Sequence, residues 1–470
     1  MNIIKIINNY FLQTSEKYFI SNSRSRIKFL ERKKNFFYEI SSFINRCINN
    51  SDKILFFCCG NSIISEKVIS KKKYIHEINY EYLNGNKNKK INLNKNLINS
   101  VDHIVIADTE YQKSLVSNLD LISHNMNNDA RVILVSKSLV WMFFINIYKK
   151  IFFRNNIKSN FLPFGYLKEL FDSQGFDLVR NEKIIFFPFN IPILNDCLNS
   201  IFRLPILNFF CLMNITIFKK KAVLKKINKI SFIVPCKNEE ENILLFRKEI
   251  SSITTDIKVE FLFGDDKSSD NTKKNIKILK KEIKNKHHII QYDGPGICKS
   301  KNVYKGIDLA SGDLIVIYDA DLTVKFNEIM KCINLLKKSN IDFINCTRMI
   351  YPQKNDAMKT LNFFGNIFFA KLFSIMFKQK ITDTLCGTKI FYKNDWNKIK
   401  RFNSKWGLLD KWGDFDLLIG AYQNNLKISE IPIHYQERTS GITKMNSLIL
   451  NTLRMLIIVL CAYYKLKIKK

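Results

Sequence analysis

The chain has 470 residues, more than one hydrophobic core usually holds, so two domains are expected. Hydrophobic residues make up 46% and charged residues 25%, which excludes a collagen-like or an intrinsically disordered chain. The 75 Lys and Arg against 42 Asp and Glu give a net charge of +33, which favours a polyanionic partner such as nucleic acid, an anionic membrane surface or a phosphorylated substrate. A general preference of this sequence for Lys, Asn, Ile and Phe explains the charge equally well.

The cysteines and the first residues indicate the compartment. The eleven cysteines form no CxxC pair and no His-Cys metal spacing, so they are expected to be buried thiols in a reducing compartment. Residues 1–19 carry polar side chains every few positions and lack the apolar stretch of a signal peptide. A cytoplasmic location is therefore expected.

The first half of the chain alternates short apolar runs with longer segments. The runs lie at 53–59, 103–108 and 131–136, and the segments between them are long enough for helices, which predicts an α/β fold with a parallel sheet. The lysine-dense stretch 219–229 precedes a fresh apolar run and is interpreted as a linker. The expected division is a first domain at 1–218, a basic linker at 219–229, a second domain at 230–445 and a C-terminal segment at 446–470.

Three expected strands of the second domain end in acidic or turn residues. In open parallel sheets, ligands bind beyond the carboxyl ends of the strands, so these ends are the expected place for chemistry. The strand ends supply, in chain order, Pro235, Asn238 and Glu239, then Asp265 and Asp266, then Asp319 and Asp321.

The sharpest motif is the pair Asp319 and Asp321 in LIVIYDADLTV. In an extended segment residues i and i+2 point to one side, so both carboxylates are expected to converge. Two like charges held together are costly unless a cation lies between them. A divalent cation that keeps water and bridges substrate phosphates suits such a site.

These motifs make residues 230–445 resemble a family 2 glycosyltransferase of the GT-A nucleotide-diphospho-sugar transferase fold, similar to the dolichyl-phosphate mannosyltransferases. The stretches that carry the resemblance are IVPCKNEEENI, DDKSSDNT, KGIDLASGDLIVIYDADLTV, DTLCGTKIF and ISEIPIHYQERTSGITK, in the order of the family.

The resemblance implies roles for individual residues. Pro235, Asn238, Glu239, Asp265 and Asp266 would line the nucleotide pocket, with Asp319 and Asp321 holding Mg²⁺ or Mn²⁺ on the diphosphate. Arg348, counted with the nucleotide-sugar-binding residues, and Arg438 and Lys444 would supply phosphate-binding cations. Asp383, Asp414 and Asp416 would lie on the acceptor side. Asp321, Arg438, Lys444 and Asp414 are the expected catalytic residues. Thr323 replaces a common Gln and weakens the case for a third metal ligand, and Cys236 replaces a common Tyr.

The reaction implied is inverting, metal-dependent transfer of a hexose from a nucleotide sugar, GDP-mannose or a UDP-hexose, to a polyprenyl phosphate. The Phe-rich segment 360–377 and the amphipathic segment 446–470, which ends in four lysines (Lys465, Lys467, Lys469 and Lys470), would place the enzyme peripherally or monotopically at the inner face of a membrane. For segment 360–377 a core helix is the competing interpretation.

Residues 50–218 resemble, more faintly, a Rossmann-like class I methyltransferase. In that family a Gly-rich turn and an acid on the first strand hold S-adenosylmethionine. Here CCGNS retains only Gly60 in the turn, and Phe56 stands near the position of the acid, so both features are missing. Glu77 or Glu81 could contact a ribose. The expectation is a degenerate domain kept for docking or stabilisation, with a working S-adenosylmethionine enzyme as the alternative.

Three rival functions remain open. One is a glycosyltransferase that acts on another glycan or lipid acceptor beside an active methyltransferase domain. Another is a small-molecule methyltransferase whose second half only binds sugar nucleotides. The last is a nucleic-acid-binding protein, which is disfavoured because the lysines are scattered and no RRM, zinc or helix-turn-helix signature is present.

Overall fold

The computed structural model shows two compact units. It describes residues 34–58, 62–77, 95–107, 115–140, 162–186, 194–204, 207–221, 225–251, 256–283, 287–352, 360–403, 410–438 and 448–468, with a few single positions between them. Unit 1 comprises Met1–Lys221 together with Leu466–Lys470, and unit 2 comprises Ala222–Lys465. The division at Lys221 falls inside the expected basic linker.

Unit 1 is built on a six-stranded sheet in the order β2-β1-β3-β4-β6-β5. The first four strands of this order pair in parallel, whereas β6 runs antiparallel to both β4 and β5. The strands are β1 (Lys53–Cys58), β2 (Lys72–Glu77), β3 (His103–Ile106), β4 (Arg131–Lys137), β5 (Phe176–Ile184) and β6 (Met213–Lys220). The three apolar runs expected as strands thus correspond to β1, β3 and β4.

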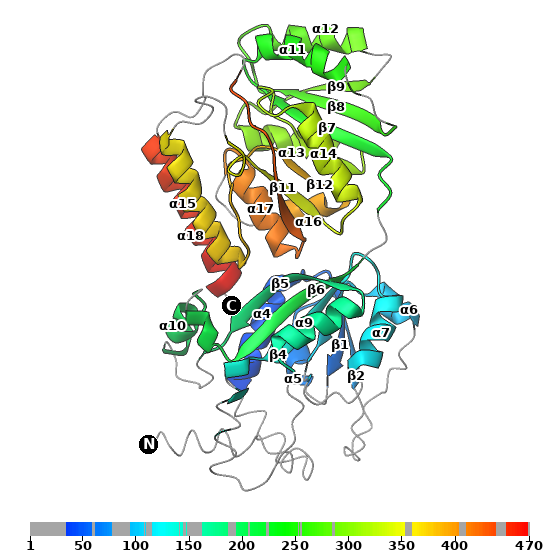
Figure 1. Cartoon of the computed structure of the whole chain (residues 1–470), viewed down its shortest axis with the longest axis vertical. Coiled ribbons are helices and arrows are strands. Elements are labelled where there is room, and N and C mark those ends of the chain that lie inside the picture. Colours follow the sequence, from blue (N-terminus) through cyan, green and yellow to red (C-terminus); the bar gives the residue numbers. More distant parts are fainter. Residues whose placement is uncertain are drawn as a thin grey trace. The chain divides into compact units, whose positions relative to one another are not determined.

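Helices cover both faces of this sheet because its strands are apolar on both sides. Ile54 and Phe56 of β1 pack in the core beside α4, whereas Leu55 and Phe57 pack in the core beside α7 and α9. Figure 1 shows this sandwich. The helices are α4 (Lys34–Cys47), α5 (Ser62–Lys67), α6 (Lys95–Ser100), α7 (Leu115–Asn125), α9 (Phe164–Ser173), α10 (Leu194–Ile201) and the 3₁₀ turn η2 (Leu207–Phe210).

The methyltransferase resemblance of unit 1 stays a prediction. The expected cofactor turn around Gly60 lies outside the described residues, and so does Glu81. Phe56 is fully buried in the core and offers no polar group to a ligand.

Unit 2 contains a seven-stranded sheet in the order β13-β11-β12-β10-β7-β8-β9. β12 is antiparallel to its neighbours β10 and β11, and the other pairs are parallel. The strands are β7 (Lys229–Cys236), β8 (Lys258–Asp265), β9 (His288–Asp293), β10 (Leu314–Ile317), β11 (Phe343–Thr347), β12 (Lys389–Tyr392) and β13 (Ile428–Pro432).

Alternate residues of β7 face opposite layers of unit 2. Phe232 and Val234 pack into the core formed with α11, α12 and α14, whereas Ile233 lies under α13, close to Gly306. The helices are α11 (Glu240–Ser251), α12 (Thr272–Ile283), α13 (Lys299–Leu309), α14 (Phe326–Lys337), α15 (Thr360–Phe377), α16 (Lys393–Asn403), α17 (Asp414–Gln423), α18 (Leu448–Tyr463) and the short η3 (Tyr464–Ile468).

The strand order creates a crevice between β7 and β10. From β7 the chain moves outward through β8 to β9 on one side, and then returns to place β10 on the other side of β7. At such a reversal the connecting helices leave in opposite directions and open a crevice beyond the carboxyl ends of the strands. Pro235 lies near the end of β7, and Asp319 and Asp321 follow β10 into this region.

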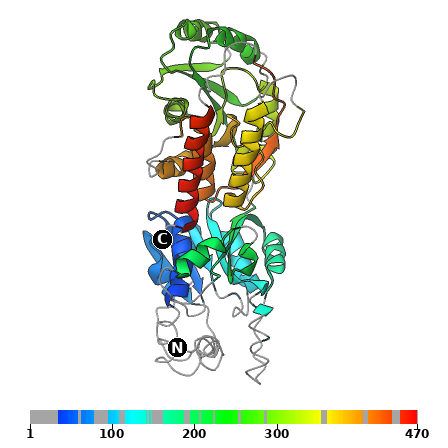
Figure 2. The same ribbon diagram turned by 90° about the vertical axis from the view of Figure 1, so that its left-hand side faces the viewer.

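Two apolar helices, α15 and α18, lie side by side at one flank of unit 2 (Figures 1 and 2). Leu361, Phe364 and Phe368 of α15 and Leu450 and Leu453 of α18 are among their exposed residues. The stretch Ile449–Lys467 is long and apolar enough to cross a membrane, and Leu361–Phe377 is a shorter apolar helix.

The structure corrects the expected basic tail at one position. Lys467 is buried within unit 1, where its ammonium group pairs with Glu182 and its carbonyl accepts a hydrogen bond from Arg203. This lysine therefore does not belong to a solvent-exposed cluster that could bind lipid headgroups. Lys469 and Lys470 lie outside the described residues.

A buried carboxylate ties the beginnings of β7 and β8 together. Glu260 is fully buried, pairs with Lys229 at 2.6 Å and accepts a hydrogen bond from the Ser311 amide at 2.8 Å. Burial opposes ionisation, but Lys229 and the serine donors outweigh it and lower the pKa of Glu260 to about 2.

Replacing Glu260 with Gln should therefore lower the free energy of unfolding by about 3 kcal/mol at neutral pH. Because the folded-state pKa lies below the ordinary value of 4.5, the stabilisation is present above pH 4.5 and is lost as the pH falls toward 2. Urea unfolding of both proteins between pH 7 and pH 3 measures this. A difference that is constant with pH would contradict the assignment.

Candidate active site

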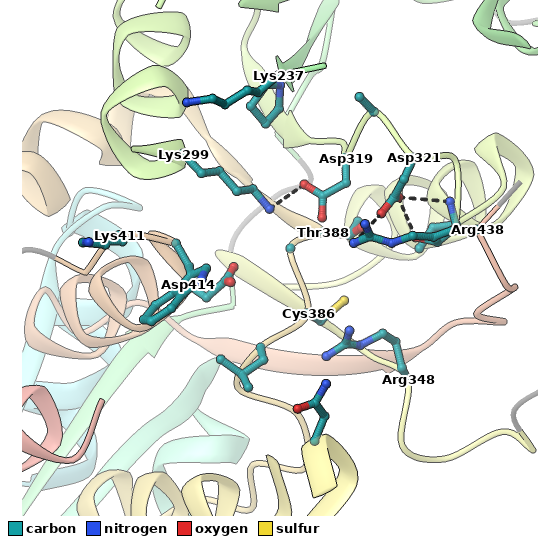
Figure 3. A pocket seen from close by; sticks show the side chains of 18 of the residues that line it. Lys237, Lys299, Asp319, Asp321, Arg348, Cys386, Thr388, Lys411, Asp414 and Arg438 are labelled. Atoms are coloured by element: carbon teal, nitrogen blue, oxygen red, sulfur yellow. Dashed lines mark hydrogen bonds and ion pairs between the residues drawn. The ribbon is translucent and has the colours of Figure 1, made fainter. Parts of the chain in front are cut away.

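A cavity of about 760 Å³ lies at the carboxyl ends of the central strands of unit 2. Its lining comes from the segments that follow β7 and β10, from the start of α13, from the loop before β12 and from the start of α17. Residues of α15 and α18 complete the wall. Figure 3 shows the charged side chains that converge on it.

Asp319 is held by a lysine at the first turn of α13. The Lys299 ammonium group lies 2.6 Å from Asp319 Oδ1. Burial disfavours both charges, yet the ion pair outweighs it, so the pKa of Asp319 is lowered and that of Lys299 is raised. The pair therefore stays charged at neutral pH.

Asp321 has a different set of partners. Arg438 Nη2 lies 3.1 Å from Asp321 Oδ2, and the Thr323 hydroxyl donates to Asp321 Oδ1 at 2.9 Å. Burial and then the negative charge of Asp319 raise the pKa of Asp321. Thr323, which the sequence suggested as a poor metal ligand, thus orients Asp321 instead.

The two carboxylates fit a divalent cation. The absence of a side chain at Gly387 leaves room for Asp319, because a Cβ there would overlap Asp319 Oδ2. Within the described residues no group of three or more His, Cys, Asp or Glu side chains could hold a metal. The protein would therefore supply Asp319 and Asp321, and substrate phosphates and water the remaining ligands, as is usual for Mg²⁺.

Arg348 reaches the cavity from the end of β11. Its guanidinium donates two hydrogen bonds to the Asp383 carboxylate, from Nε to Oδ2 at 2.8 Å and from Nη2 to Oδ1 at 2.9 Å. Asp383 itself is fully buried and does not border the cavity. Asp383 therefore binds Arg348 from behind the cavity wall, and its expected place on the acceptor side stays a prediction.

Asp414 and Asp416 begin α17 but have different surroundings. Asp414 borders the cavity and lies 3.4 Å from the buried Lys389 ammonium, and burial raises its pKa. Asp416 does not border the cavity and accepts a hydrogen bond from Tyr304 at 3.1 Å. Burial and the neighbouring Asp410 raise the pKa of Asp416 to about 8, so it is protonated at neutral pH.

The expected nucleotide residues divide into two groups. Pro235, Glu239 and Asp266 border the cavity, and Asp266 Oδ1 accepts a hydrogen bond from the Gly296 amide at 2.6 Å. Asn238 and Asp265 do not border it.

Asn238 and Asp265 instead contribute to the framework behind the cavity. Asn238 has a positive φ of 52° and accepts a hydrogen bond from the Ser269 amide, so it shapes the turn before α11. Asp265 is buried at the end of β8, and its Oδ1 has no hydrogen-bond partner among the described residues. Lys444 lies outside the described residues.

Several lining residues were not predicted. Lys299 is the most important of them, since it pairs with Asp319, and Lys237 and Lys411 add further positive charge. The turn Gly294-Pro295-Gly296 before α13 was the available signal for Lys299. Four polar residues of α15 and α18 also border the cavity: Asn362, Asn366, Asn451 and Thr452.

Comparisons with known proteins agree with this geometry. Residues 231–405 match the family model for Glycosyl transferase family 2. The chain carries a family 2 glycosyltransferase domain. This agrees with the predicted family 2 resemblance of residues 230–445 and makes the chain a glycosyltransferase.

A curated relative is the undecaprenyl-phosphate 4-deoxy-4-formamido-L-arabinose transferase of Proteus mirabilis (strain HI4320). It is 33% identical over 103 residues, which are 22% of this chain and 31% of that protein. The match thus spans less than a third of the length of this relative.

Solved structures of glucosyl-3-phosphoglycerate synthase from Mycobacterium tuberculosis are also similar. The complex with Mn²⁺, UDP and glucosyl-3-phosphoglycerate is 14% identical, with 50% of this chain and 80% of that chain covered at a TM-score of 0.37. The complex with Mg²⁺ and UDP has the same identity and TM-score, with 50% and 79% covered.

The close approach of Gly387 to Asp319 can be tested by Gly387→Ala. The added methyl group should displace Asp319 and also meet Lys299 Nζ at 2.9 Å, so transferase turnover should fall about 100-fold. Gly165→Ala is the control, because a Cβ there meets nothing within 4 Å. Turnover of labelled nucleotide sugar and thermal unfolding are measured; an active, folded Gly387→Ala protein would contradict this view of Asp319.

Asp416→Asn should stabilise the protein by about 4 kcal/mol at pH 7 and leave turnover unchanged. Since burial raises the pKa of Asp416 from 3.8 to about 8, the native protein loses stability as the pH rises between these values, whereas the amide of the variant does not titrate.

Asp414→Asn, at the cavity wall, should instead lower turnover at least about tenfold. Denaturant unfolding at pH 4 and pH 7 and initial rates provide the readouts. A loss of turnover in Asp416→Asn would support the expectation from the sequence that Asp416 lies on the acceptor side.

Proposed function

We propose that the chain transfers a hexose from a nucleotide sugar to a polyprenyl phosphate at a membrane surface, with inversion at the anomeric carbon. The observation that carries the proposal is the composition of the cavity wall. Carboxylates and cations for a diphosphate, at Asp319, Asp321, Lys299 and Arg438, share one cavity with the two exposed apolar helices α15 and α18. A lipid with a phosphate headgroup suits such a combination.

The acceptor phosphate needs little activation. Its second pKa is near 6, so at neutral pH it is already a dianion, and its oxygen can attack the anomeric carbon directly. The bond from that carbon to the diphosphate breaks, and the nucleoside diphosphate leaves. Arg438 and Lys299 supply positive charge where the leaving group gains negative charge.

Asp319 and Asp321 are the residues that would hold Mg²⁺ or Mn²⁺. When bound, the cation would act as a Lewis acid on the diphosphate. Lys299 keeps Asp319 ionised and Thr323 orients Asp321, so the protein presents both carboxylates before the substrate arrives.

The membrane contact would use α15 and α18. Their exposed apolar side chains, Leu361, Phe364, Phe368, Leu450, Leu453 and Ile457, suit burial in the headgroup and acyl boundary of a bilayer. The burial of Lys467 within unit 1 at the end of Ile449–Lys467 favours a helix that lies in the interface over one that crosses. The matched part of the Proteus mirabilis relative, a transferase named for undecaprenyl phosphate, supports the same acceptor class.

For unit 1 we propose a stabilising or docking role without catalysis. Its sheet of parallel strands with an antiparallel β6 supports the predicted methyltransferase-type architecture. Phe56 stands buried where an acid would contact a cofactor, which argues against S-adenosylmethionine binding.

The test is transfer of labelled sugar from a panel of nucleotide sugars into solvent-extractable lipid. Membranes containing the protein receive polyprenyl phosphate and Mg²⁺ or Mn²⁺. One donor should label the lipid, and EDTA should abolish the signal. Asp321→Ala should lose at least about 100-fold, because it removes a carboxylate of the expected metal site and its ion pair with Arg438.

The control for this test is Asp256→Ala, an exposed position between α11 and β8 that should keep full activity. Transfer to soluble acceptors only, with no labelled lipid, would replace the polyprenyl phosphate by another acceptor class. Activity that survives both EDTA and Asp321→Ala would overturn the metal assignment.

A further inference from the structure

The orientation of Arg348 is set by a buried side chain that does not reach the cavity. Asp383 accepts Nε, Nη2 and also the Arg348 amide at 3.0 Å, so it fixes both the side chain and the backbone of this arginine. The pair occupies the Nε–Nη2 edge of the guanidinium, and Nη1 takes no part in it. Tyr435, 5.1 Å from the guanidinium carbon, supports its face.

Asp383 is itself held by the apolar helix α15. Asn366, which is 1% exposed, donates from Nδ2 to Asp383 Oδ1 at 2.7 Å. The same amide accepts, through Oδ1, the Thr384 amide at 3.0 Å and the Thr384 hydroxyl at 3.2 Å. One side chain therefore joins α15 to the loop that carries Asp383.

Asn366 is a buried polar residue in a helix, α15, that is otherwise mostly apolar. An asparagine this deeply buried in an otherwise Phe-rich helix needs partners for both its donor and its acceptor groups, and the 382–384 loop satisfies both. Ser374 makes a second polar attachment of α15, through Ile381, but it contacts neither Asp383 nor Arg348 in the hydrogen bonds described.

We propose that Asn366 and Asp383 are positioning residues that hold Arg348 for the acceptor phosphate, and that Asn366 links this arginine to the helix that meets the membrane. This inference rests on the proposed acceptor class. An arginine held through a bidentate pair loses little further freedom when it binds a phosphate, so disturbing the hold weakens acceptor binding without touching the donor side.

The experiment measures farnesyl phosphate binding to the full chain by titration calorimetry. Asn366→Ala and Arg348→Lys should each weaken binding about tenfold, the effect of losing one hydrogen bond to a charged group. The double variant should bind no worse than Arg348→Lys alone, because Asn366 acts through Arg348. In transfer assays the acceptor KM should rise, while the donor KM stays unchanged.

Ser374→Ala is the matched control, since it removes a polar attachment of the same helix and should leave farnesyl phosphate binding unchanged. Thermal unfolding checks each protein, and Asn366→Ser serves if the alanine variant does not fold. Native-like acceptor binding by the Asn366 variants, or additive losses in the double variant, would show that Asn366 does not position Arg348. Unchanged binding in Arg348→Lys would instead overturn the acceptor role of Arg348, and the positioning role with it.

Discussion

The candidate site depends on keeping two carboxylates charged and close together in a buried place. Asp319 and Asp321 are two residues apart, and the charge of the first raises the pKa of the second. Lys299 and Arg438 offset this repulsion, one for each carboxylate. Much of unit 2 serves this arrangement: the reversal between β7 and β10 opens the space, α13 presents Lys299 and Gly387 leaves room for Asp319.

A second layer of buried polar contacts supports the cavity wall. Asn345 donates to the Asp383 carbonyl at 2.7 Å and to Glu430 at 2.9 Å, and Lys389 donates to Asn345 at 3.1 Å while facing Asp414. The ends of β11, β12 and β13 are thereby joined through side chains as well as through the sheet. Such a network favours one arrangement of the wall, because each partner would be costly to leave unpaired.

The sequence predicted the site residues that stand directly after a strand. It missed those that other elements, such as α13, bring to the site. Asp319, Asp321 and Asp266 were found because apolar runs ended at them. Lys299 resembled the other basic residues, since only the three-dimensional fold brings the start of α13 to Asp319 after β10. The burial of Asp383 was missed for a related reason, as a motif position carries no information about burial.

The membership of Leu466–Lys470 in unit 1 makes that unit discontinuous in the chain. A ribosome delivers residues from the N-terminus, and domains usually fold as they emerge. Here the pairing of Lys467 with Glu182 cannot form until the whole glycosyltransferase domain has been made. Unit 1 is therefore begun before unit 2 and completed after it. A chain that ended before η3 would lack this ion pair.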